Sequence, residues 1–142
     1  MKPITGIAVD GSTRGNPGPS EYRGVDLLSK KVVFHQKIGF STNNITEFIA
    51  LCHAIFLFKN KKTIIYTDSQ TALFWLKNKS VTTRLQKNEK TKIAHIYLDR
   101  CLSKLEEINI YDDGIYLRIN DLKISKWLTS KWGEIPADFN LK

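Results

Sequence analysis

Short apolar runs alternate with turn-forming segments along the first forty residues. Residues 4–9 form an apolar run, and the segment GSTRGNPGP at residues 11–19 follows it, a pattern typical of a strand and then a loop. Residues 22–28 and 31–40 predict two further strands, joined by a tight turn at residues 29–30. We therefore expect an antiparallel meander of three strands at the start of the chain.

The next segments predict a helix, a strand and a second helix. Residues 45–58 are apolar almost all round and contain no Gly or Pro, which indicates a buried helix that Asn43 or Asn44 can cap. Residues 63–67 are β-branched and aromatic, as in a strand, and residues 69–77 predict a short helix. A strand, a helix and a strand in this order favour a right-handed crossover between two parallel strands.

The second half of the chain begins with a basic, polar segment, residues 79–92, which we expect to be an exposed connection. Asn88 can cap a third helix, whose apolar positions are Ile93, Ile96, Cys101, Leu102 and Leu105. Residues 108–119 predict a β-hairpin and residues 123–128 a last strand, followed by a loop. The expected fold is α/β, a mixed five-stranded sheet with an antiparallel meander and parallel strands flanked by helices.

Composition and charge narrow the range of partners. The 142 residues include 22 Lys and Arg against 14 Asp and Glu, a net charge of +8 that attracts polyanions, nucleic acid first and acidic membranes second. No apolar run approaches the roughly 18 residues of a membrane span, no repeat or linker is present, and we expect no secretory signal. Two cysteines without a C-x-x-C pair exclude a zinc ribbon and fit a reducing compartment. We expect a single domain over residues 1–142, in the cytoplasm and without membrane contact.

Acidic residues stand at positions where solvation alone does not explain them. Asp10 ends the first predicted strand and Asp68 follows the strand at residues 63–67, so both should lie at the same edge of the sheet. Alternation along the first strand places Asp10 on the face of Ala8 and Gly6, which are small enough for a helix to approach closely. Glu47 lies in the first turn of the buried helix, on the side expected to face the sheet.

A fourth acid, Asp138, follows a Pro and can lie in the first turn of a helix. Each acid alone has a simpler explanation: a turn at Asp10, a helix cap at Asp68, a helix N-terminus at Glu47 and a solvated tail at Asp138. Four acids at one edge would repel one another unless divalent cations were bound. Carboxylate oxygens favour Mg²⁺ or Mn²⁺, and two such ions can support phosphodiester hydrolysis.

Four segments carry a resemblance to a known family: AVDGSTRGNPGPSEYRGV, TNNITEFIALCHAI, YTDSQTALFWLK and WLTSKWGEIPADF. In this order and spacing they resemble type 1 ribonuclease H, and WGEIPAD is similar to the C-terminal loop of its compact bacterial branch. The resemblance implies a ribonuclease H-like fold and a nuclease that cuts the RNA strand of RNA–DNA hybrids, leaving 5′-phosphate and 3′-hydroxyl ends. It implies two Mg²⁺ ions, which Mn²⁺ can replace, held by Asp10, Glu47, Asp68 and Asp138, with Glu134 in an auxiliary catalytic role.

The same resemblance implies contacts with both strands of the hybrid. The expected RNA contacts are Gly15, Asn16, Asn43 and Gln70. The expected DNA contacts are Thr42, Asn44, Trp75, Thr83, Arg84 and Thr129. Two alternatives stay open, because Asn43 or Asn44 can serve as a helix cap and Trp75 can belong to the core.

Two features qualify the resemblance. No separate hybrid-binding module is expected, because the catalytic pattern begins by residue 4, and we expect a monomer. The hairpin at residues 108–122 is longer than the compact branch needs and has no assigned role. Two other functions compete: a non-catalytic hybrid-binding protein of the same fold, and a DNA-directed nuclease of the resolvase or recombinase kind. The complete acidic set argues against the first, and the TNN and GNPG segments argue against the second.

Overall fold

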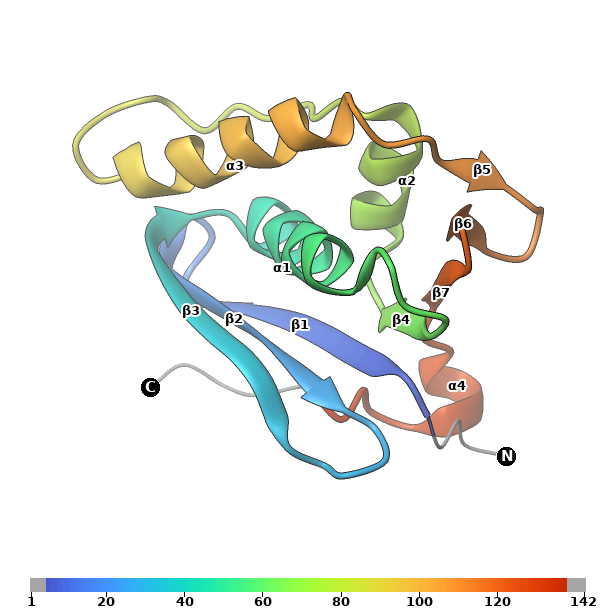
Figure 1. Ribbon diagram of the computed structural model, residues 1–142. Coiled ribbons are helices and arrows are strands. Elements are labelled where there is room, and N and C mark those ends of the chain that lie inside the picture. Colours follow the sequence, from blue (N-terminus) through green and yellow to red (C-terminus); the bar gives the residue numbers. More distant parts are fainter. Residues whose placement is uncertain (1–4, 138–142) are drawn as a thin grey trace.

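A mixed sheet with helices packed on it forms the fold (Figure 1). The computed structural model describes residues 5–137 of the 142. The strands are β1 Ile7–Thr13, β2 Gly18–Asp26, β3 Val32–Ser41, β4 Ile64–Thr67, β5 Tyr111–Asp112, β6 Leu117–Ile119 and β7 Leu122–Lys126. The helices are α1 Asn43–Phe58, α2 Gln70–Asn78, α3 Lys92–Leu105 and α4 Thr129–Trp132. Within the described part of the chain, every helix is too short or too polar to cross a membrane.

The sheet has seven strands in the order β3-β2-β1-β4-β7-β6-β5. The α/β class and the mixed pairing are confirmed, since β1, β2 and β3 pair antiparallel while β4 pairs parallel with β1 and β7. The expected number of five strands is wrong. The predicted hairpin exists, but β6 pairs with β7 and buries Leu117 and Ile119, so both hairpin strands extend the same sheet.

The first strand is longer than the sequence pattern predicts. Residues 11–13 continue β1 instead of starting a loop, because they pair with residues 20–22 of β2. Asp10 therefore lies inside the strand. The expectation that Asp10 ends the strand is wrong. The turn between β2 and β3 is confirmed, and the Asp26 carboxylate closes it by accepting hydrogen bonds from the backbone N–H groups of Leu28 and Ser29, at 2.8 and 3.2 Å.

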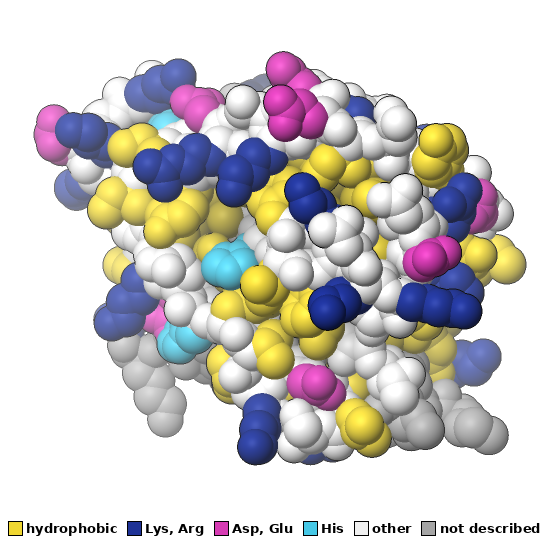
Figure 2. Space-filling view, in the orientation of Figure 1, with side chains coloured by type: hydrophobic (Ala, Val, Ile, Leu, Met, Phe, Trp, Pro, Cys, Tyr) yellow, Lys and Arg dark blue, Asp and Glu magenta, His cyan; other side chains and the backbone are white. Residues whose placement is uncertain are grey.

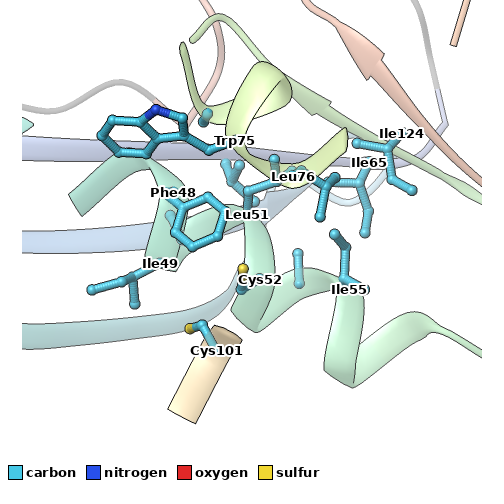
Figure 3. Packing of buried hydrophobic residues seen from close by; sticks show 14 of the residues in the cluster. Phe48, Ile49, Leu51, Cys52, Ile55, Ile65, Trp75, Leu76, Cys101 and Ile124 are labelled. Atoms are coloured by element: carbon cyan, nitrogen blue, oxygen red, sulfur yellow. The ribbon is translucent and has the colours of Figure 1, made fainter. Parts of the chain in front are cut away.

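Helix α1 is the centre of the main core. It packs on β1 on one side and on α2 and α3 on the other, and ten of its sixteen residues are buried, as its apolar sequence predicts. The cap is Thr42, whose hydroxyl accepts from the N–H of Ile45 at 3.2 Å, so the expected caps Asn43 and Asn44 are wrong. Figure 3 shows Phe48, Leu51 and other α1 side chains packing against strand and helix neighbours.

Helix α3 differs from its expected pattern at two points. Asn88 does not cap it; its side chain closes a turn by accepting from the N–H of Lys90 and of Thr91, and Thr91 is the residue at the cap. Ile93 and Ile96 are exposed, and the buried face consists of Ala94, His95, Leu98, Cys101 and Leu105. The expected helical period is correct, but the buried face of α3 includes the small residue Ala94 and the polar residue His95 in place of Ile93 and Ile96.

The other face of the sheet has a second, smaller core. Ala8, Tyr66 and Trp127 pack there with Ile135 and Ala137, which come from the chain after α4. That segment was expected to be a loop, and α4 adds one short helix to it. Helices α1 to α3 lie together on the opposite side of the sheet (Figure 1), so the two faces are covered by different parts of the chain.

Candidate metal centre and nucleic-acid contacts

Three carboxylates from distant parts of the chain meet at one place. Asp10 comes from the middle of β1, Glu47 from the first turns of α1, and Asp68 directly follows β4. One oxygen from each lies within 4.8 Å of the other two, and Asp10 and Glu47 are only 5% and 4% exposed. The structure thus brings together three of the four acids that the sequence singled out. The fourth, Asp138, lies outside the described residues.

Glu47 is held in place by the backbone of β1. The N–H of Gly11 donates a hydrogen bond of 2.8 Å to Glu47 Oε1. A Cβ at position 11 would lie 2.8 Å from Thr46 Cγ2 and 3.1 Å from the Glu47 nitrogen, so glycine is what allows α1 to approach β1 this closely. We expected the close approach at Ala8 and Gly6. The structure has it at Gly11, on the opposite face of β1 from Ala8.

Asp68 stands between the end of β4 and the start of α2. The capping role belongs to the next residue, Ser69, whose hydroxyl accepts from the N–H of Ala72 at 3.0 Å. The hydroxyl of Thr67 in turn accepts from the N–H of Ser69 at 3.1 Å, which fixes the chain on both sides of Asp68. The explanation of Asp68 as a simple helix cap is therefore wrong.

The segment leading toward Asp138 is anchored by an arginine and a tryptophan. Arg23 is the cross-strand partner of Asp10, and its Nε donates a hydrogen bond of 2.7 Å to the carbonyl of Ala137. Trp127 Nε1 donates to the carbonyl of Gly133 at 2.9 Å, and the Trp127 ring contacts Tyr66 edge-on. Burial raises the pKa of Tyr66. Sequence reasoning missed Arg23, because a lone arginine within a half-buried strand carries no distinctive pattern.

Most of the expected RNA contacts lie on exposed surface near α1 and α2. Asn16, in the loop between β1 and β2, accepts a hydrogen bond of 3.0 Å from the N–H of Asn43, and this contact joins the loop to the start of α1. Gly15 in the same loop has a φ of 82°, in the left-handed region. Gln70 is exposed at the first residue of α2, two residues after Asp68. Glu134, the expected auxiliary residue, is exposed beyond α4.

The expected DNA contacts have diverse environments. Thr42 caps α1 and Asn44 is exposed beside it, while Thr83, Arg84 and Thr129 are exposed on other segments. Trp75 is 7% exposed and packs edge-on against Phe48, at 5.9 Å between ring centroids (Figure 3). Trp75 therefore packs as a core residue, in agreement with the alternative given for it above.

Positive side chains concentrate near α3. The chain from Lys79 to Thr91 has no regular structure, and its exposed cations include Arg84, Lys87 and Lys90. Figure 2 shows Lys and Arg side chains gathered at the upper left, over this part of the molecule. The basic surface can attract a negatively charged polymer such as nucleic acid. The acidic centre can bind cations, which in turn can contact the phosphates of that polymer.

All three ligand atoms at the acidic centre are carboxylate oxygens, which suit a hard divalent cation and not zinc. Fold and site together define an α/β protein with a candidate cation centre and a basic surface. A sequence model of the RNase H family matches residues 3–110. Since this match covers most of the chain, the protein belongs to the RNase H family, whose members are metal-dependent hydrolases.

Solved structures of similar fold include other RNase H proteins. RNase H1 from the halophilic archaeon Halobacterium salinarum NRC-1 is 20% identical, with 89% of this chain and 87% of that chain covered and a TM-score of 0.48. LC11-RNase H1, isolated from compost, is 20% identical over 88% and 84% of the two chains, with a TM-score of 0.49. The same enzyme in complex with an RNA/DNA hybrid is 18% identical over 88% and 86%, with a TM-score of 0.47.

Proposed function

We propose that this ribonuclease H hydrolyses the RNA strand of RNA–DNA hybrids and leaves 5′-phosphate and 3′-hydroxyl ends. The observation that carries the proposal is the convergence of Asp10, Glu47 and Asp68, with one oxygen of each within 4.8 Å of the others, in a chain of the RNase H family. Asp138 completes the proposed set of metal ligands. The proposed cofactor is a pair of Mg²⁺ ions, and Mn²⁺ can replace them.

The carboxylate residues supply a prearranged binding site. When bound, the ions supply the positive charge that activates a water and stabilises the leaving oxygen. Asp10 and Glu47 are shielded from bulk water, which strengthens their attraction for cations. The Gly11 N–H holds one oxygen of Glu47 and thereby orients the whole carboxylate before any ion arrives. Glu134 is the proposed auxiliary residue near the reacting phosphate.

Recognition of the hybrid rests on two sets of side chains. The proposed RNA contacts are Gly15, Asn16, Asn43 and Gln70, which read the 2′-hydroxyl groups that distinguish RNA from DNA. The proposed DNA contacts are Thr42, Asn44, Trp75, Thr83, Arg84 and Thr129. The hydrogen bond between Asn16 and Asn43 supports the first set, because it brings two of its members from separate segments together. We further propose that residues 1–142 act as one catalytic domain, as a monomer in the cytoplasm.

A cleavage assay tests the proposal directly. One labelled strand is placed in RNA–DNA, RNA–RNA or DNA–DNA duplexes and incubated with the protein and Mg²⁺ or EDTA. We expect cleavage of the RNA strand of the hybrid with Mg²⁺ and none with EDTA. Asp10→Asn should abolish cleavage and keep or strengthen hybrid binding. Binding without cleavage by the wild type would instead indicate a hybrid-binding protein, and cleavage of all-DNA duplexes a DNA-directed nuclease.

A further inference from the structure

A groove separates α2 from the hairpin that extends the sheet, and Figure 1 shows β5 and β6 beside α2. Its volume is about 280 Å³, at the lower end of the roughly 300–1,000 Å³ of small-ligand pockets. Leu73 of α2 and the buried side chains of Leu117 and Ile124 line it. The groove therefore has room for a small planar group and not for a helix or a duplex.

One end of this groove opens beside the carboxylate centre. Gln70 lines the groove and lies two residues after Asp68 along the chain. Lys126, which also lines it, is the parallel-strand partner of Thr67, the residue directly before Asp68. A nucleic-acid strand with a phosphate at the carboxylate centre would consequently have its neighbouring nucleotides near the mouth of the groove.

At the other end an ion pair spans the groove. Lys77, near the end of α2, meets Asp112 of β5 with 2.8 Å between Nζ and Oδ2. This contact joins the two walls of the groove away from the carboxylate centre.

The rim carries exposed apolar side chains that the fold does not need for its core. Phe74 is 61% exposed and Ile115 is 87% exposed, and both line the groove. An exposed aromatic ring is a stacking platform for an unpaired base, while a base inside a duplex is already stacked on its neighbours. Two lysines against one aspartate along the groove give it the positive charge that a phosphate prefers.

We propose that this groove binds an unpaired nucleotide of the RNA strand where the strand leaves the hybrid. The inference rests on the proposed function, because the strand that is cut is the strand whose phosphate lies at the carboxylate centre, next to Gln70 and Lys126. Phe74 stacks on the base, and Lys126 contacts the phosphate. The hairpin thereby gains a role, as the second wall of a site for junctions between hybrid and single-stranded RNA.

Fluorescence anisotropy of labelled substrates tests this proposal. The Asp10→Asn protein, which is expected to bind without cutting, is titrated with a blunt hybrid, with hybrids that carry a short RNA overhang at either end, and with matched DNA overhangs. We expect one RNA overhang to tighten binding about tenfold relative to the blunt hybrid, as one stacked base would. Adding Phe74→Ala or Ile115→Ser should remove this gain and leave binding of the blunt hybrid unchanged.

The matched control is Leu28→Ala, which removes an exposed apolar side chain from the turn between β2 and β3 and should keep the overhang gain. Equal affinity for blunt and RNA-overhang hybrids would overturn the proposal, as would an equal gain from DNA overhangs. Self-association that depends on Phe74, without any overhang gain, would assign the groove to protein contact instead. Failure of the proposed function would be recognised by a different result, because the wild-type protein would then leave the blunt hybrid uncut.

Discussion

The carboxylate centre should make the metal-free protein less stable than it would be without one of its acids. Asp10, Glu47 and Asp68 hold one oxygen each within 4.8 Å of the others, and two of the three side chains are almost fully buried. Asp10→Asn keeps the size of the side chain and removes its charge. In the absence of divalent cations we therefore expect this variant to unfold at a higher temperature than the wild type.

The magnitude follows from Coulomb's law. Two unit charges at the 4.8 Å upper limit of this separation repel by about 3.5 kcal/mol at an effective dielectric constant of about 20, and Asp10 has two such neighbours. Arg23 faces Asp10 across the β1–β2 pair, and its positive charge offsets part of this repulsion. We expect a net gain of roughly 1–3 kcal/mol in the free energy of unfolding, which corresponds to about 3 °C per kcal/mol for a chain of this size.

Thermal unfolding in EDTA measures the effect of the lost charge on stability, and thermal unfolding in increasing Mg²⁺ measures the stabilisation by bound cations. The wild type should gain stability with Mg²⁺, by about 2.7 kcal/mol at a hundred times the dissociation constant, and the Asn variant should gain little. Cleavage of the hybrid should be lost in the variant throughout. A variant that melts below the wild type in EDTA, or gains as much from Mg²⁺, would refute the idea that these acids are held together for cations.

Three further predictions concern the surroundings of the site. Gly11→Ala should cost about 1–3 kcal/mol of stability through overpacking and should also abolish cleavage, because the added Cβ displaces α1, which carries Glu47. The control is Gly24→Ala, whose Cβ meets the ring of Phe34. This control should lower the melting temperature while cleavage persists. Arg23→Gln should speed amide hydrogen exchange in the segment after α4 and lower the melting temperature in EDTA, since it weakens the hydrogen bond to the Ala137 carbonyl, worth about 1 kcal/mol, and removes the charge that faces Asp10. Burial and the neighbouring thiol of Cys101 raise the pKa of Cys52, and both thiols are buried. Iodoacetamide at pH 8 should therefore leave both thiols unmodified in the native protein and modify both in denaturant. Mass spectrometry measures the extent of modification.

Local patterns predicted the parts of the fold that depend on local sequence. The meander, the buried helix and the parallel pairing of β4 follow from apolar runs and turn residues, and all are present. The number of strands was missed although β6 and β7 form a local hairpin through the two-residue turn at Asn120. What no short segment encodes is the pairing of β7 with β4, which joins this hairpin to the main sheet. The cap of α1 was missed because Thr42, Asn43 and Asn44 are all good caps, and a shift of one residue decides among them.

The candidate site was predictable in composition but not in detail. Four acids were singled out from the sequence, and the three that lie within the described residues converge in space. The importance of Gly11 was hidden, because Asp-Gly usually indicates a turn and here continues a strand under a helix. Arg23 contacts Ala137, more than a hundred residues away, and contacts at such separation leave no trace in periodicity.

The unequal covering of the two sheet faces has a consequence for how the protein loses activity. One face is sealed by three helices, whereas the opposite one is closed in part by α4 and by Ile135 and Ala137 beyond it. Detaching the segment from α4 to Ala137 exposes far less apolar surface than unfolding the whole domain. The free energy of this local opening is therefore smaller than the free energy of global unfolding. Heat or mild denaturant should accordingly produce molecules that are intact by circular dichroism yet unable to cut, and inactivation should precede unfolding.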